Sequence, residues 1–390
     1  MDIQATQFLK NGIKTAEYFG FRHIDTFKKN PLCLDCDKKI DLSVSAQNKK
    51  IDALHGILCG GAQMFCDNKL QAIEEPILFY NIEQVPRSND AVLALHIYNV
   101  EKSIAESILI HAMRALTLDL GFSDHSVRIN SLGDRDSSIR YVRELTNYLR
   151  KRLDDMPEAA RELMKEHVLY ALMYLIEKEH ELAFRSPNPL EYLSDPSRKH
   201  FREIIEYLDM TETPYEIDPK LIGHHECYSD ALFAIDILDS EGSRLENAPL
   251  TIRGGRYNEF VQRNTKRIIP ATGAVAILKN KKTPSRIPGK ANLKPSVYIV
   301  QLGFGPKIKS LQLVDTLRQA GIPVYQNLAS DSLSEQLRNA EAIGVKYTII
   351  IGQKEYVENS VILRDMEARN QEHVPINNVA QKLKKASVAV

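Results

Sequence analysis

The chain has 390 residues, of which 43% are hydrophobic and 26% are charged, with 51 basic and 51 acidic side chains. This length exceeds what one hydrophobic core usually organises, so we expect at least two domains. The equal numbers of acidic and basic residues exclude a global field that would draw the protein to polyanions, so any nucleic-acid contact must come from local patches. No apolar stretch approaches the ~18 residues of a membrane helix, and the N-terminal residues lack a secretory pattern. We therefore expect a cytoplasmic protein without a membrane segment.

The first third of the chain alternates between helical and extended patterns. Apolar residues at helical spacing predict the helices, and β-branched and aromatic residues predict the strands. Residues 33–75 allow no firm assignment, because Gly60 and Gly61 interrupt their apolar run. The predicted elements are a helix over 5–18, a strand over 20–25, a strand over 77–85, a turn over 86–90, a partner strand over 96–102, a helix over 103–120 with Gly121 as its C-terminal cap, and a strand over 125–134.

The middle of the chain begins with helices and ends with strands. Two strongly helical segments indicate an inserted hairpin, about 137–186, which Pro187 and Pro189 end. Another helix follows, with Ser197 as its N-terminal cap. Hydrophobic runs then indicate a buried antiparallel sheet. The predicted elements are helices over 137–152, 158–182 and 200–209, a strand over 215–218, and three strands of one sheet over 231–238, 249–257 and 271–278.

The C-terminal part alternates regularly between strand and helix, behind a basic segment rich in turn residues. The order is a strand over 297–302, a helix, a strand over 322–328, a helix, strands over 347–352 and 360–367, and a final helix. Gly321 and Gly344 stand where helix caps belong. This order implies a mostly parallel sheet flanked by helices. We therefore expect an α+β body over 1–280, a basic linker over 281–295 and an α/β module over 296–390.

Two groups of residues suggest metal or redox chemistry but lack the spacing of a site. Cys33 and Cys36 form a Cys-x-x-Cys pair without a second pair at ligand spacing, so we favour scattered structural cysteines and expect no metal. His224 and His225 precede Glu226. Adjacent residues of a strand point to opposite faces, so both imidazoles cannot easily reach one ion, and a polar loop is the favoured interpretation. The odd number of cysteines, 5, agrees with a reducing compartment.

The segment RGGRY at 253–257 indicates a binding site more strongly. Paired glycines let a backbone approach a ligand, and the flanking arginines could hold a phosphate or a carboxylate. A β-bulge with solvated arginines is the alternative that stays open. The segment GFGPK at 303–307 lacks the ending of a phosphate-binding loop and is interpreted as a strand-to-helix turn.

Several segments, in order along the chain, resemble the class II histidyl-tRNA synthetases. They are KTAEYFGFRHIDT at 14–26, LFYNIEQVPR at 78–87, LHIYNVE at 95–101, AESILIHAMRALTLDLGFSDHSVRINSLGD at 105–134, NPLEYLSDPSRKHFREIIEYLD at 188–209, GGRY at 254–257 and PATGAVAIL at 270–278. The pattern over 297–352 looks like the anticodon-binding domain of that family. Because the order is kept over nearly the whole chain, the resemblance is specific.

The resemblance implies an antiparallel six-stranded catalytic sheet with helices, a helical insertion and a mixed α/β anticodon domain. It also implies a homodimer that has tRNA as a partner. In that family, the carboxylate of histidine attacks the α-phosphate of ATP, while arginines and Mg²⁺ stabilise the developing charge, and the product is transferred to tRNA. ATP and Mg²⁺ are therefore the expected cofactors if the protein is active.

The catalytic positions of the family are poorly kept in this sequence. Arg87 matches the arginine that grips the α-phosphate, but the residues after it depart from the family and the loop is shorter. His96 matches a histidine of the family, while Ile97 replaces the glutamine that follows it. The arginine that holds the γ-phosphate falls near Lys279 or Asn280, and neither side chain forms the planar fork of a guanidinium.

The amino-acid pocket of the family is altered as well. Residues 55–57, His-Gly-Ile, stand at the Arg-Pro-Glu whose glutamate meets the substrate ammonium. Residues 223–228 stand at the RGLDYY signature without its arginine, although Glu226 and Tyr228 could still line a pocket. The resemblance adds as candidate substrate-binding residues Gly254, Gly255, Arg256 and Tyr257.

The loss of several preorganised groups, each worth about 10²–10³ in rate, would leave little adenylation. We therefore expect a protein that binds tRNA, with ATP and histidine as further candidate ligands and with aminoacylation weak or lost. Three alternatives stay open: an active histidine–tRNA ligase, a histidine-sensing regulatory subunit and a module that binds a protein partner. The candidate RNA-binding residues of the linker, whose alternative role is that of solvated charges, are Lys281, Lys282, Arg286 and Lys290.

Overall fold

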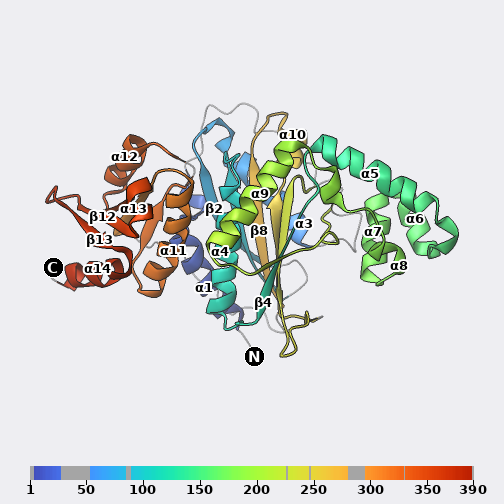
Figure 1. Ribbon diagram of the computed structural model, residues 1–390, viewed down its shortest axis with the longest axis horizontal. Coiled ribbons are helices and arrows are strands. Elements are labelled where there is room, and N and C mark those ends of the chain that lie inside the picture. The colour runs from blue at the N-terminus through green and yellow to red at the C-terminus, as the bar shows by residue number, and fades with distance from the viewer. Residues whose placement is uncertain are drawn as a thin grey trace.

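A computed structural model describes residues 4–27, 53–84, 89–224, 227–245, 247–279, 295–328 and 330–388. The molecule is elongated (Figure 1). A C-terminal module (residues 295–388) lies at one end, an N-terminal body built on a large sheet lies in the middle, and a group of helices from residues 135–184 projects at the other end. No helix within the described residues is both long and apolar enough to cross a bilayer.

An eight-stranded sheet forms the centre of the N-terminal body, in the order β1-β2-β3-β8-β7-β6-β4-β5. Its strands are β1 (Arg22–His23), β2 (Ile77–Gln84), β3 (Ala91–Tyr98), β4 (His125–Ser131), β5 (Tyr215–Ile217), β6 (Ala231–Ile237), β7 (Leu250–Arg256) and β8 (Ala271–Leu278). The six central strands, from β2 to β4 in this order, all pair antiparallel with their neighbours. The short edge strands β1 and β5 pair parallel with β2 and β4. The predicted antiparallel sheet is confirmed, and the two edge strands extend the six that the resemblance implied.

Helices cover both faces of this sheet. One face carries α1 (Ala5–Tyr18), α4 (Ile104–Asp119) and α9 (Asp195–Met210), and the other carries α3 (Ala53–Asp67), α10 (Asn258–Thr265) and the projecting helices. Because side chains of a strand alternate between faces, β8 sends Ala274 and Ala276 to the α4 face and Val275 and Ile277 to the α3 face. β8 is buried along its whole length, which is why its sequence is a continuous apolar run.

The projecting helices are more broken than their composition suggests. They are α5 (Arg135–Arg150), α6 (Glu158–Glu166), α7 (Val168–Glu177) and α8 (Glu181–Phe184), so the predicted single helix over 158–182 is wrong. His167 has φ −160° and ψ 137°, and its Nδ1 accepts a hydrogen bond from the N–H of Leu169. His180 accepts in the same way from Leu182. A side chain that caps a new helix competes with continuation of the old one.

Strand β3, the antiparallel partner of β2, begins earlier than expected. The sequence predicts a strand over 96–102, but β3 starts at Ala91 and ends at Tyr98. Every residue of β3 is buried, so the strand lacks the alternation that marks a half-exposed strand.

The start of α9 also differs from the prediction. The N-cap is Ser194, whose side chain accepts a hydrogen bond from the N–H of Ser197. Ser197, the predicted cap, lies inside the first turn, and its hydroxyl donates to Asp230. A tertiary contact therefore uses the hydroxyl that the sequence offered as a cap.

The C-terminal module is a five-stranded sheet in the order β10-β9-β11-β12-β13, flanked by helices. Its elements are β9 (Val297–Gln301), α11 (Phe304–Gln319), β10 (Val324–Gln326), α12 (Leu333–Ile343), β11 (Tyr347–Ile351), α13 (Gln353–Val357), β12 (Ser360–Asp365), β13 (Gln371–Pro375) and α14 (Val379–Val388). The first three strands pair parallel and the last two antiparallel. Gly321 and Gly344 both have φ +74°, as expected of residues that end helices.

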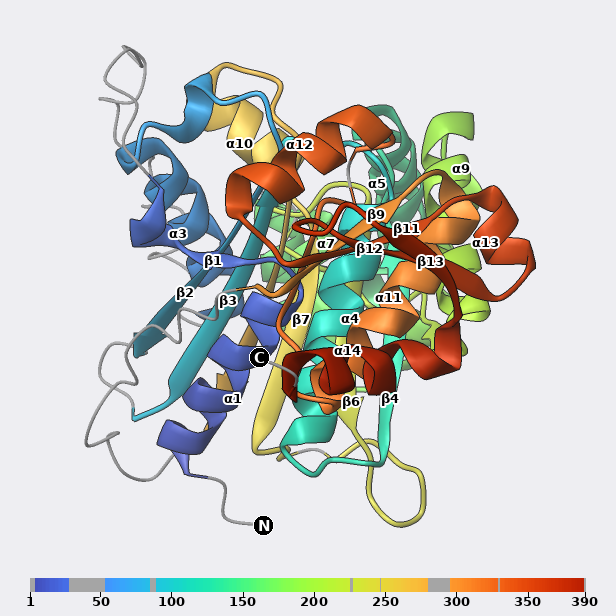
Figure 2. The ribbon, with the colours of Figure 1, turned by 90° about the vertical axis from the view of Figure 1, so that its left-hand side faces the viewer.

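The module docks on the body through α11, which lies beside α1 and α4 (Figure 2). Arg318 of α11 is 9% exposed and pairs with Asp119 at the end of α4. Asp331 accepts from Lys102 of the body at 2.7 Å and from Lys307 of α11 at 2.8 Å. Burial would raise the pKa of Asp331, but the two ammonium groups lower it to about 2. The contact between the two parts is therefore ionic as well as apolar.

Candidate functional site

Several predicted site residues lie outside the residues that the structure describes. They are Cys33, Cys36, Arg87, His225, Glu226, Asn280, Lys281, Lys282, Arg286 and Lys290. Their roles stay predictions. The remaining candidate substrate-binding residues, Tyr228 and the segment 254–257, all lie at or beside β7.

A hydrogen-bonded network of polar side chains lies under α3 in the middle of the sheet. His96 of β3 contacts the hydroxyl of Tyr257 through Nδ1 at 3.0 Å and Oδ1 of Asn81 through Nε2 at 3.2 Å. The hydroxyls of Tyr257 and Tyr98 are 3.0 Å apart. Burial lowers the pKa of His96 to about 3, so the imidazole is neutral at physiological pH. It acts here as a partner of neutral groups and carries no positive charge.

Helix α3 shields this network of side chains from solvent. A Cβ at Gly61 would lie 2.0 Å from Cε1 of His96, so the helix backbone rests directly on the imidazole. The ring of Phe65 stacks on Tyr98, with centroids 4.0 Å apart and planes 9° apart. His96, Tyr98 and Tyr257 are consequently 0% exposed. Ile57, which the resemblance places at the glutamate of the family's Arg-Pro-Glu, is buried in the same apolar layer.

The paired glycines of β7 make space for aromatic rings of the chain itself. A Cβ at Gly254 would lie 2.4 Å from Cζ of Phe233, and one at Gly255 would lie 2.9 Å from Cδ1 of Tyr228. Gly223 contacts the other edge of the Tyr228 ring, where a Cβ would lie 2.3 Å from Cδ2. Pairing with both neighbouring strands is regular, so the alternative of a β-bulge is wrong. The rings of Phe233 and Tyr228 thus occupy the space beside the two glycines that a ligand would need.

Arg256 binds a carboxylate that belongs to the chain. Its Nε and Nη2 donate to Glu106 of α4 at 2.7 and 2.8 Å. Its Nη1 and Nη2 also donate to the carbonyl oxygens of Val100 and Lys102. The guanidinium is 2% exposed, so the alternative of a solvated arginine is wrong here. Burial would raise the pKa of Glu106, but Arg256 and His200 lower it to about 2, which keeps the carboxylate charged.

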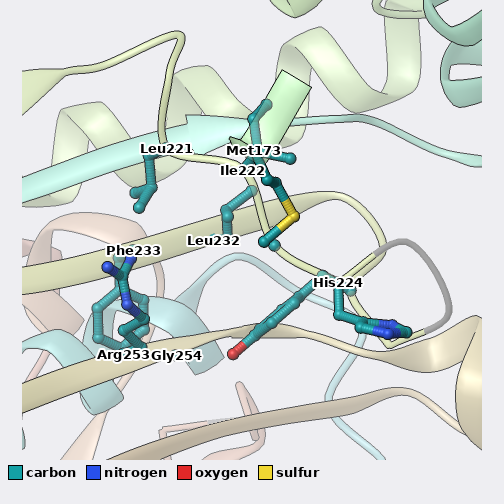
Figure 3. Close-up of a pocket in the computed structure, with 10 residues that line it drawn as sticks. Met173, Leu221, Ile222, His224, Leu232, Phe233, Arg253 and Gly254 are labelled. Atoms are coloured by element: carbon teal, nitrogen blue, oxygen red, sulfur yellow. The ribbon is translucent and has the colours of Figure 1, made fainter. Parts of the chain in front are cut away.

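A small pocket opens on the α3 face of β7 (Figure 3). Loop 221–224, Tyr228, β6, β7 and Met173 of α7 supply its walls, and its free volume is about 20 Å³, close to the space of one water molecule. Nε2 of His224 lies 3.0 Å from the hydroxyl of Tyr170, within hydrogen-bond distance. Burial lowers the pKa of His224 to about 4. The pocket includes Arg253, a residue absent from the family-based candidates. The feature of the sequence that could have indicated Arg253 is its position directly before Gly254 and Gly255.

Comparison with known proteins identifies relatives along most of the chain. Residues 296–386 match the family model described as an anticodon binding domain. The histidine–tRNA ligase of Fervidobacterium nodosum is 29% identical over 280 residues, which cover 70% of this chain and 65% of that protein. The ligase of Clostridium perfringens is 26% identical over 332 residues, which cover 80% of this chain and 76% of that protein.

The match with these relatives is partial in length. The chain spans less than two thirds of the Fervidobacterium ligase, at 65%, and of a Dehalococcoides mccartyi ligase, at 63%. The solved apo histidyl-tRNA synthetase of S. aureus is 17% identical and covers 83% of this chain and 81% of that chain, with a TM-score of 0.45.

The contact between Gly61 and His96 predicts a sharp difference between two neighbouring glycines. Gly61→Ala should lower the free energy of unfolding by about 1–3 kcal/mol, because the added methyl group must displace a packed imidazole. Gly60→Ala is the matched control, because a Cβ there meets nothing within 4 Å. It should leave stability unchanged or raise it by up to about 1 kcal/mol through helix propensity. Urea unfolding measures both, and equal effects would contradict the closed arrangement.

The ion pair of Arg256 predicts a large and pH-dependent loss of stability. Glu106→Gln should lower the free energy of unfolding by about 3–5 kcal/mol at pH 7, because it leaves a buried guanidinium without its counter-charge. The lowered pKa of Glu106 means that its contribution is complete above about pH 4.3 and is lost as the pH falls toward about 2. The variant should lack this part of the acid dependence.

The control for the ion pair is an exposed pair of the same kind. Glu181→Gln removes the partner of Arg185, and both side chains are more than 70% exposed, at 74% and 72%. Stability should change by less than about 0.5 kcal/mol. If urea unfolding of Glu106→Gln resembles that of this control, the central role of the buried pair is refuted.

Proposed function

Because the chain belongs to the histidyl-tRNA synthetase family, we propose that it binds tRNA through its C-terminal module and forms histidyl-adenylate weakly or not at all. The observation that most strongly supports weak or absent adenylation is the closure of the α3 face of the sheet, where His96, Tyr98 and Tyr257 are 0% exposed. A substrate over that part of the sheet would have to displace α3.

The proposal of tRNA binding is supported by the completeness of the C-terminal module. The anticodon-binding match runs over residues 296–386, which include all five strands of the second sheet and its helices to α14. The module is held against the body by the contacts of Arg318 and Asp331, so a bound RNA would meet a surface with a defined orientation. An RNA held at both parts would gain from that preorganisation.

The proposal of weak adenylation is supported by the use that the chain makes of its charged groups. Arg256 is engaged by Glu106 and two carbonyl oxygens, which leaves little of its guanidinium for a substrate. At the end of β8, where the family places an arginine, Lys279 is exposed and offers a single ammonium. Fewer preorganised cations mean less stabilisation of the charge that develops on the α-phosphate.

The described residues by themselves hold neither cofactor of the family. No group of three or more His, Cys, Asp or Glu side chains is placed to hold a metal within the described ranges, and Mg²⁺ that arrives with ATP needs only one or two carboxylates beside the phosphates. Among the cations at this part of the sheet, Arg256 is engaged by Glu106. No adenylation step through ATP or Mg²⁺ is therefore assigned to these residues.

Histidine-dependent ATP–pyrophosphate exchange tests the catalytic half of the proposal. The pure protein should exchange at least about 10³-fold more slowly than an active histidine–tRNA ligase assayed beside it, since several charge-stabilising groups are replaced. Exchange at the rate of the active ligase would overturn this half and favour an active enzyme. Histidine binding without exchange and without RNA binding would favour a regulatory subunit instead.

Binding of deacylated tRNA at increasing salt tests the other half. The affinity should fall steeply with salt, because basic side chains displace counterions from phosphates. Lys281→Ala with Lys282→Ala should weaken binding and reduce the slope of log affinity against log salt by about two. The matched control is Lys199→Ala with Arg202→Ala, two exposed residues of α9 with the same total charge. Equal effects of both pairs would contradict a linker contact, and no binding at low salt would overturn the RNA role.

A further inference from the structure

A cavity, here called the seam cavity, lies between the N-terminal body and the C-terminal module. Its free volume is about 440 Å³, which is in the range of pockets that hold small organic molecules. The body lines it from the end of α1 through β1 to Thr26, and the module lines it with Pro295, the start of β10 and Ile343 at the end of α12. The two parts touch beside the cavity, where a Cβ at Gly20 would lie 3.4 Å from the carbonyl oxygen of Gln326. A ligand in the seam cavity would therefore contact both parts of the molecule.

Most polar side chains of the seam cavity lie on its body side. Glu17 accepts a hydrogen bond from the hydroxyl of Tyr80 at 3.0 Å, which orients its carboxylate. Arg22 is exposed, and its guanidinium lies over the ring of Phe27, 4.6 Å from the ring centre. Thr26 adds a hydroxyl oxygen that can accept a hydrogen bond. The body side therefore offers both donors and acceptors to the edge of a ligand.

Aromatic and apolar side chains form the floor and the module side of the seam cavity. Tyr18 and Phe21 are buried and form the floor. On the module side, Val324 is buried, Tyr325 is half-buried and Ile343 is 39% exposed. Aromatic walls gain most from a second ring, which packs against them edge-on or in an offset stack. This lining therefore favours a flat ring over a branched aliphatic group.

The charges of the lining argue for an uncharged ligand. Within the described part of the chain, the lining contains one carboxylate, that of Glu17, and one guanidinium, that of Arg22. His23 also lines the cavity, and its Nδ1 lies 3.2 Å from a carboxylate oxygen of Asp25. A phosphate would be attracted by Arg22 but repelled by Glu17 and Asp25. An uncharged ligand avoids that repulsion.

We propose that the seam cavity binds an uncharged, flat heteroaromatic ring. The polar edge of the ring faces Glu17, Arg22 and Thr26, and its apolar faces pack against Tyr325 and Ile343. Nucleobases and indoles have this chemistry, since each has a ring that stacks and an edge that forms hydrogen bonds. A free nucleoside and an unpaired base of an RNA present the same ring, and the test below distinguishes these two sources. Because the ring contacts both parts of the molecule, its binding also stabilises the docked module.

This site is separate from those of the proposed function. The seam cavity lies beside α1 and β1, whereas α3 covers the opposite face of the sheet and the tRNA test uses Lys281 and Lys282 of the linker. Binding of a free ring by a protein that binds no tRNA would overturn the RNA role and leave the seam site intact. Binding of tRNA without binding of any ring would do the reverse.

The sequence contains no tryptophan, so the fluorescence of an added indole reports its binding to the full chain without a tryptophan background. The uncharged probe N-acetyltryptophanamide should bind saturably. Adenosine should displace it at a lower concentration than AMP does, because AMP carries a charged phosphate. If deacylated tRNA at low salt also displaces the probe, the site takes a base of RNA. If adenosine displaces the probe and tRNA does not, the site takes a free small molecule. Either result supports the seam site.

Two residues of α12 provide a matched pair of variants. Ile343 is 39% exposed and lines the seam cavity, whereas Leu333, at the start of the same helix, is 40% exposed and lies outside the lining. Ile343→Gln should weaken probe binding at least about 5-fold, because an amide replaces an apolar contact with the ring. Leu333→Gln should bind as the unmodified chain does. Arg22→Met removes donors at the polar edge and should weaken adenosine binding about 10-fold.

The proposal is overturned if neither the indole nor adenosine binds, if AMP binds more tightly than adenosine, or if Ile343→Gln and Leu333→Gln bind alike. Should Ile343→Gln fail to fold, hydrogen exchange of the unmodified chain decides the matter. Saturating adenosine should slow amide exchange several-fold both in residues 17–23 and in β10, the two sides of the seam cavity. Protection confined to the N-terminal body would place adenosine elsewhere and refute the proposal.

Discussion

The buried ion pair between Arg256 and Glu106 is the interaction on which the arrangement of the molecule depends. It joins β7 to α4, and the same guanidinium holds the carbonyl oxygens of Val100 and Lys102. Lys102 in turn reaches Asp331 of the C-terminal module. A charge pair withdrawn from water is stable only while both partners are present. The sheet, the helix behind it and the docking of the module are therefore linked by one set of contacts.

The paired glycines of the same strand show how a motif associated with ligands can serve packing on both faces of the sheet. Gly254 and Gly255 leave space that aromatic rings fill, and Gly61 of α3 lets the helix backbone rest on His96. Because interiors are close-packed, a space left by a missing Cβ is filled by whatever neighbour can reach it. Near β3 and β8 that neighbour is the chain itself. Near Arg253 the walls leave a small opening.

Much of the fold could be predicted, because long elements with apolar periodicity are well marked in a sequence. The strands β6, β7 and β8 and the α/β order of the module were found in this way. Helix α3 was missed because Gly60 and Gly61 oppose a helix, and the reason for Gly61 is a tertiary contact with His96. The break at His167 was missed because a cap is a single hydrogen bond, which composition does not reveal.

By itself, the sequence predicted the α+β class and the likeness to histidyl-tRNA synthetases, and it led us to expect that several of that family's catalytic side chains are replaced. It placed Arg253 and Arg256 beside the paired glycines but left a β-bulge open, so it did not decide which faces of the sheet the two side chains occupy; the regular strand pairing puts them on opposite faces. Only the tertiary structure decided which of the two is internal. Glu106, 150 positions away in the chain, neutralises Arg256, whereas Met173 and loop 221–224 bring an apolar pocket to Arg253. Such partners are fixed by packing between distant segments, and no local pattern records them.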